Sequence, residues 1–218
     1  MSRWLKRFYA SLALPLAPWT RVALVVAVIP LALAAMAPLW TLHFAAPQYP
    51  KGLDLYVYTY TIEGGNEGND LPEINTLNHY VGMKKLDPAD FAELDFIPFA
   101  IGALFLLALR VAAIGDVRSL IDLGVLTGYF GAFSLGRFVY MLYTYGHRLD
   151  PHAPIRMPAF MPPILGTKEM GNFTVSSWPA EGTWLLSIFG VVVVGLVLWY
   201  FVRSPAASPP RPREVAPR

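Results

Sequence analysis

The sequence contains no cysteine and few charged residues. Without cysteine, neither a disulfide framework nor a thiolate metal site can form, so a bound metal ion would need His, Met, carboxylate or carbonyl ligands. Asp, Glu, Lys and Arg make up 15% of the 218 residues, whereas hydrophobic residues make up 55%. A soluble domain usually has about 25% charged residues. The composition therefore predicts an integral membrane protein.

The sequence also lacks the common motifs of nucleotide binding and hydrolysis. It has no phosphate-binding glycine loop, no HExxH and no GxSxG. The acidic residues between positions 43 and 95 are typical of a solvated face, although they could also attract a cationic partner or a metal ion. We therefore expect a protein that is not an enzyme and that binds no nucleic acid.

Four apolar runs are each long enough to cross a bilayer as a helix. They cover residues 21–42, 97–114, 122–143 and 183–202. Lys and Arg gather in the segments outside these runs that the positive-inside rule then places in the cytoplasm. These segments are the N-terminus (1–20), a turn (115–121, with Arg110 and Arg118 beside or in it) and a proline-rich tail (203–218) that is expected to be disordered.

The two long connections, residues 43–96 and 144–182, should then lie on the extracytoplasmic side. The predicted fold is an all-α membrane protein with four transmembrane helices and both termini in the cytoplasm, whose two extracytoplasmic loops form a small mixed α+β cap. The first run could instead be a cleaved signal peptide, because Ala35-Met36-Ala37 resembles a cleavage site. Pro38 would block cleavage there, which favours a retained helix.

The first connection contains a predicted amphipathic helix. Asp70 can cap it, Glu73 follows three residues later, and Ile74, Leu77 and Val81 form an apolar stripe. The simplest interpretation is a capped helix that lies on the membrane or on its own domain.

A neighbouring stripe of this helix carries Asn75, His79 and Met83 at i, i+4 and i+8. A His and a Met on one helix face form a plausible half-site for copper(I). His147, just outside the third run, could complete a three-coordinate site, with Met161 as a fourth ligand. The alternative has His79 hydrogen-bonded to Asn75 or to a loop carboxylate, with Met83 merely packed. Asn75 and Asp150 are then structural residues.

Further soft or borderline ligands in the second connection are His152, Met157 and Met170. Methionine, however, also fills gaps in packed loops. Arg137 lies inside the third apolar run, where a charged residue is a functional candidate by default. Its position near the outer end favours a structural role that anchors the loops.

Several stretches resemble a family of small four-helix bacterial membrane proteins with an LNHYIGM signature. The chain has Leu77-Asn78-His79-Tyr80-Val81-Gly82-Met83, and it also has Tyr145-Gly146-His147 followed by Asp150-Pro151. Further agreement lies in Ala46-Pro47-Gln48-Tyr49-Pro50 with Gly52-Leu53, in Ile62-Glu63-Gly64-Gly65, and in Pro162-Pro163-Ile164-Leu165-Gly166-Thr167-Lys168 with Asn172-Phe173-Thr174. The resemblance covers about residues 38 to 182.

Members of that family are often encoded beside nitrous-oxide reductase and its copper-maturation proteins. The resemblance therefore implies an accessory protein of the bacterial inner membrane that supports copper delivery to, or assembly of, an extracytoplasmic copper-dependent electron-transfer enzyme. Its partners would be membrane lipids and proteins of that system, and His79, Met83 and His147 would contact copper. The alternative is a metal-free scaffold subunit of a larger respiratory or photosynthetic complex. A transporter is less favoured, since few polar groups could line a path.

Overall fold

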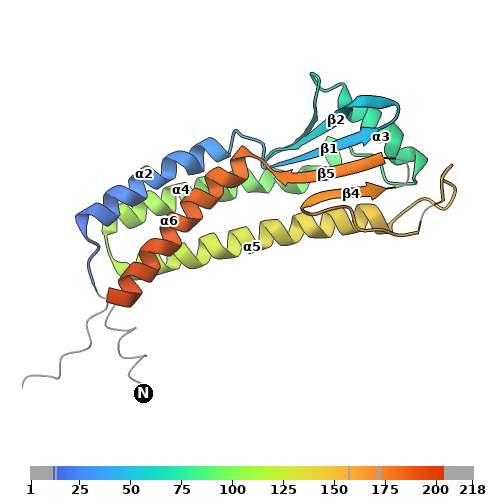
Figure 1. The fold of residues 1–218 in the computed structure, drawn as a ribbon. Helices are drawn as coiled ribbons and strands as arrows, with labels where there is room; N and C mark the ends of the chain where they lie inside the picture. The colour runs from blue at the N-terminus through green and yellow to red at the C-terminus, as the bar shows by residue number, and fades with distance from the viewer. Residues whose placement is uncertain (1–11, 13, 157, 171–172, 204–218) are drawn as a thin grey trace, which may run out of the picture.

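The fold was derived from a computed structural model that describes residues 12, 14–156, 158–170 and 173–203. Within these residues it contains helices at one end and a five-stranded sheet at the other (Figure 1). In chain order the elements are α2 (Pro18–Ala34), β1 (Trp40–Ala46), β2 (Tyr49–Val57), β3 (Ile62–Gly64), α3 (Asp70–Tyr80), the 3-10 helix η1 (Pro88–Asp95), α4 (Phe96–Ile114), α5 (Val117–His147), β4 (Gly166–Met170), β5 (Phe173–Pro179) and α6 (Glu181–Arg203).

Three of the described helices, α4, α5 and α6, are long and apolar enough to cross a membrane. The apolar helix α2 has only 17 residues and is shorter than these three. It packs against both α4 and α6 (Figure 1). The helical core includes Leu24, Leu31, Ala108, Leu120 and Val193, none of which has any exposed surface.

The strands form one antiparallel sheet in the order β3-β2-β1-β5-β4. Strand β1 lies at its centre, where Leu42 is opposite Leu55 of β2 on one side and Ser177 of β5 on the other. Side chains alternate between the two faces of a strand. One face is therefore apolar and buried under α3 and neighbouring segments, and it carries Leu42, Phe44, Leu53, Leu55 and Val175.

The sheet is joined to the helices at one hydrogen-bonded junction. Strand β1 follows α2 and strand β5 leads directly into α6, as Figure 1 shows. The backbone N–H of Ala180 donates to the carbonyl of Leu39 at 3.0 Å, and that of Gly182 donates to the carbonyl of Pro38 at 2.8 Å. A Cβ at Gly182 would lie only 2.9 Å from the carbonyl oxygens of Ala37 and Pro38. This close approach requires glycine.

The prediction of an all-α protein with four transmembrane helices is wrong. The described chain contains a five-stranded antiparallel sheet, and three of its helices are long and apolar enough to span a membrane. Residues 40–42, expected at the end of the first spanning helix, belong to strand β1. An averaged hydropathy cannot distinguish a buried strand from the end of an apolar helix, and Pro38 marks the change of structure between them.

Helix α5 is longer than the predicted run of 122–143. Its 31 residues correspond to about 46 Å at 1.5 Å per residue, more than the ~30 Å hydrocarbon core of a bilayer. Figure 1 shows that its C-terminal half runs beside the sheet. One helix thus links the membrane-length bundle with the sheet domain.

The end of α5 provides a test of this arrangement. The N–H of Phe160 donates to the carbonyl of Gly146 at 3.0 Å, and a Cβ at Gly146 would lie 2.0 Å from the carbonyl oxygen of Phe160. Gly146→Ala should therefore displace residues 160–162 and destabilise the protein by about 1–3 kcal/mol, measured as a lower thermal unfolding midpoint in detergent.

Gly136→Ala on the same helix is the matched control, because nothing lies within 4 Å of a Cβ added there. Alanine favours a helix interior over glycine, so this midpoint should stay unchanged or rise slightly. Equal midpoints for the two variants would contradict the described packing.

Candidate functional site

The predicted half-site of His79 and Met83 does not lie on one helix face. Helix α3 ends at Tyr80, and Gly82 has a φ of +79°, a conformation that favours glycine. His79 is exposed, whereas Met83 is partly buried and packs against the apolar core of the sheet domain. The inference from i, i+4 spacing fails because the helix stops between the two residues.

Two polar side chains of α3, those of Asp70 and Asn75, have structural partners. Asp70 is not the cap of the helix. Its buried carboxylate instead accepts a hydrogen bond from the backbone N–H of Asp54 at 2.9 Å, which ties α3 to β2. The amide of Asn75 accepts from the N–H of Leu86 at 2.7 Å and donates to its carbonyl at 3.0 Å. Asn75 therefore fixes the segment that follows the helix.

The other predicted ligands occupy different environments. His147 is exposed at the end of α5, where its ring stacks on Tyr143 at a centroid distance of 3.8 Å and its Nδ1 lies 2.9 Å from the Tyr143 carbonyl oxygen. Met161 is partly buried, and its carbonyl accepts a hydrogen bond from Lys168 at 2.9 Å. Met157 lies outside the described residues.

Arg137 is partly buried in α5. Its guanidinium carbon lies 5.2 Å from the ring centroid of Tyr140, in the range of a cation–π interaction. The two residues are three positions apart, so they lie on neighbouring positions of one helix face.

The two long connections meet beside His79. The N–H of Asp150 donates to the carbonyl of Gly82 at 2.8 Å, and that of Ile155 donates to the carbonyl of Tyr80 at 2.9 Å. A Cβ at Gly82 would lie 2.9 Å from the Asp150 carbonyl oxygen, so a larger residue would separate the segments. The contact brings the end of α3 to the segment that follows α5.

The Asp150 carboxylate holds the turn that follows this contact. It accepts a hydrogen bond from the backbone N–H of His152 at 2.8 Å, and its oxygen lies 3.3 Å from His152 Nδ1. The backbone hydrogen bond is the main reason that the pKa of Asp150 is lowered, and the nearby side chains of His152 and His79 lower it further. We call His79, His147, Asp150 and His152 the histidine edge.

In the described parts of the chain, no three His, Asp or Glu side chains lie close enough together to hold a metal ion. Met83 packs against the apolar core, whereas the ring of His79 is exposed. The copper set of His79, Met83, His147 and Met161 includes two methionines, which such a group does not count, and it stays a prediction.

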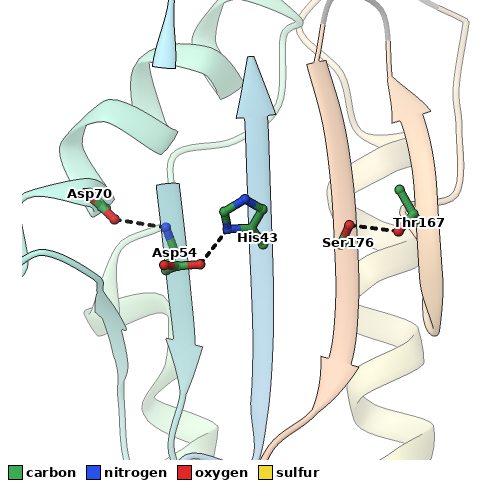
Figure 2. Close-up of polar contacts among 5 residues, drawn as sticks. All are labelled: His43, Asp54, Asp70, Thr167 and Ser176. Carbon is green, nitrogen blue, oxygen red and sulfur yellow. Dashed lines mark hydrogen bonds and ion pairs between the residues drawn. The ribbon is translucent and has the colours of Figure 1, made fainter. Parts of the chain in front are cut away.

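The sheet carries a second group that the sequence analysis did not single out. Figure 2 shows it as a row across the polar face. His43 Nδ1 lies 2.7 Å from an Asp54 carboxylate oxygen, and His43 is opposite Ser176, whose hydroxyl is 2.8 Å from that of Thr167. We call His43, Asp54, Ser176 and Thr167 the polar row. Alternation in residues 40–46, had it been read as a strand, would have placed His43 on this face.

The polar row has the residue types of a hydrolytic triad without its geometry. The ring of His43 lies over Gly52, where a Cβ would come within 2.3 Å of Nε2. Among the described residues, His43 bonds to Asp54 and Ser176 bonds to Thr167, and no hydrogen bond joins His43 to Ser176 (Figure 2). Nucleophilic catalysis needs that bond. The row is therefore a hydrogen-bonded surface of the sheet.

A cavity of about 930 Å³ lies between the apolar face of the sheet, α5 and the other membrane-length helices. One of its lining residues is Asn78, whose side chain is buried and 1% exposed. Among the described residues, neither the oxygen nor the nitrogen of this amide has a hydrogen-bond partner. Leaving a buried polar group unsatisfied costs about 1–3 kcal/mol. Such a group marks the cavity as a candidate binding site.

Comparison with known proteins adds no assignment to these groups. No protein-family model, no curated protein and no solved structure matches the chain.

Proposed function

We propose that the chain is a metal-free scaffold subunit of a larger respiratory or photosynthetic membrane complex. The observation that supports this proposal best is the hydrogen-bonded junction between helices and sheet. Strands β1 and β5 pair from Trp40↔Pro179 to Ala45↔Thr174, and each is joined to an apolar helix by a few residues at most. Such a junction holds the sheet at a fixed place relative to the bundle, as a docking platform requires.

The polar face of the sheet is the surface that such a subunit would offer to a partner. It is covered by neither α3 nor the apolar core, and its side chains come from β1, β2, β5 and β4. The polar row fixes the central side chains of this face in defined orientations (Figure 2). Preorganised side chains reduce the entropy that is lost on binding.

The proposed location is the bacterial inner membrane, with the sheet on the extracytoplasmic side. Arg110 and Arg118 flank the α4–α5 junction at the opposite end of the bundle from the sheet (Figure 1). The Arg21 guanidinium lies over Gly115 in that same junction. Positive charge of this kind favours the cytoplasmic side.

This orientation is tested by reporter fusions. An alkaline phosphatase domain fused after Gly68, in the turn before α3, should be active, because that enzyme folds only outside the cytoplasm. A fusion after Gly115, between α4 and α5, should be inactive. The opposite pair of results would invert the orientation.

The scaffold function is tested by affinity purification from native membranes. Ser176→Arg places a long cation in the polar row and should reduce the yield of the co-purified partner about tenfold, since an unpaired charge in an interface is strongly unfavourable. The control is Thr76→Arg on exposed α3, which should leave the yield unchanged.

Both variants should have the thermal unfolding midpoint of the wild type, so that a loss of the partner can be attributed to the changed surface and not to unfolding. Equal partner yields from Ser176→Arg and wild type would contradict docking on the polar face. A wild type that purifies alone under mild detergent would contradict the scaffold function itself.

Copper delivery is the second candidate, and the histidine edge is the observation that favours it. Three exposed histidines lie on segments that the Gly82–Asp150 contact joins, and a carboxylate lies beside two of them. Imidazole binds copper in either oxidation state. A transient site, assembled when a copper donor or acceptor docks, would suit delivery better than the tight site that the sequence predicts.

For this candidate, the purified protein should compete with a chelator for one Cu(I) ion per chain. His79→Ala should abolish the competition, whereas His43→Ala on the polar face of the sheet should not affect it. Binding that is absent from the wild type, or lost equally in both variants, would remove copper delivery and leave the scaffold function in place.

A further inference from the structure

The cavity beside α5 extends along much of that helix. Its lining runs from Thr127 to Tyr145 on α5, which corresponds to about 27 Å of helix axis. The remaining walls come from both halves of the molecule, with Leu31 and Phe189 from the bundle and Phe44 and Val175 from the sheet. The cavity is thus long enough to hold an extended chain that reaches from the bundle into the sheet domain.

The chemistry of its walls is that of a site for an apolar molecule. The described residues that line it are mainly aliphatic and aromatic, and Arg137 is the only charged one among them. The Arg137 guanidinium is already placed over the Tyr140 ring. No acidic side chain of the described chain lines the cavity. A cationic head group would find no acidic partner there, and burying a charge without a partner is costly.

Two polar side chains in this lining, those of Asn78 and Ser134, have no hydrogen-bond partner among the described residues. Both atoms of the Asn78 amide and the hydroxyl of Ser134 are buried. A side-chain amide both donates and accepts hydrogen bonds, so Asn78 matches an uncharged head that contains a carbonyl or hydroxyl group.

We propose that this cavity binds a membrane-derived amphiphile with a long apolar chain and an uncharged head, hydrogen-bonded through a carbonyl or hydroxyl to Asn78. The chain lies along α5 between Thr127 and Tyr145. Two membrane sources supply this chemistry, namely acyl glycerides and isoprenoid quinones. The site is independent of the polar row and of the histidine edge.

The test uses the full-length protein in phosphatidylcholine nanodiscs and two photoactivatable probes. One probe is a monoacylglycerol with a diazirine in its chain, and the other is a prenylated benzoquinone with a diazirine in its chain. Peptides that contain Asn78 and Ser134 are then examined for covalent label by mass spectrometry. Labelling by one probe in preference to the other identifies the source of the ligand.

The matched variants are two glycines of α5. Gly131 lines the cavity, whereas Gly136 does not, and nothing lies within 4 Å of a Cβ added at either position. Gly131→Phe should fill the cavity and reduce labelling of the Asn78 peptide about tenfold, while Gly136→Phe should leave it at the wild-type level. Equal labelling in the two variants, or no label on the Asn78 peptide in wild type, would overturn the proposal.

A second variant tests the role of Asn78 itself. Asn78→Leu has a similar size and removes the hydrogen bonds. The concentration of unlabelled probe that halves the labelling should therefore rise about five- to tenfold. Its thermal midpoint without probe should not fall, because the apolar replacement leaves no buried group unsatisfied. An unchanged competition constant would show that Asn78 does not recognise the head, and would overturn that part of the proposal.

Discussion

The pairing of β1 with β5 is the interaction on which the rest of the structure depends. These strands are about 130 residues apart in the sequence, yet they pair from Trp40↔Pro179 to Ala45↔Thr174. Each is connected to an apolar helix within a few residues, so their hydrogen bonds also bring the start of α6 against the end of α2. Without this pairing, β1–β2–β3 and β4–β5 would be separate ribbons, and two-stranded ribbons are marginally stable in water. The sheet, its buried face and the cavity beneath it all follow from one long-range contact.

A second consequence concerns where chemistry can occur. The polar row and the histidine edge both lie where segments distant in the sequence meet, the first across β1, β2, β5 and β4, the second between the ends of α3 and α5. Their side chains are held by local hydrogen bonds, such as those of Asp54 and Asp150. Among the described residues, no hydrogen bond joins His43 to Ser176, and no three His, Asp or Glu side chains lie close enough together to hold a metal ion. Ordered but exposed polar groups of this kind suit recognition, because rigid side chains lose little entropy on binding.

The sequence predicted the local features and missed the long-range ones. Hydropathy located the helices α4, α5 and α6. The helix around Ile74 and Leu77 was also predicted, but not its end at Tyr80, so the same-face argument for Met83 failed. The pairing of β1 with β5 leaves no local signal. Residues 40–42 look like the end of a spanning helix, and Thr167-Lys168-Glu169 is too polar to be read as a strand.

Asn78 is the clearest example of a residue whose burial the local sequence pattern does not predict. It sits on α3 between the apolar stripe and the exposed ring of His79, so helical periodicity alone assigns it no special place. Only the fold of both long connections over α5 buries it against the cavity. A residue that is buried without partners conflicts with the otherwise consistent pattern of apolar positions inside and polar positions outside. Conflicts of this kind concentrate at functional sites, where the local cost is offset by binding. Since leucine or methionine would fill the same space at no such cost, the amide at position 78 is the strongest sign that this cavity serves a ligand.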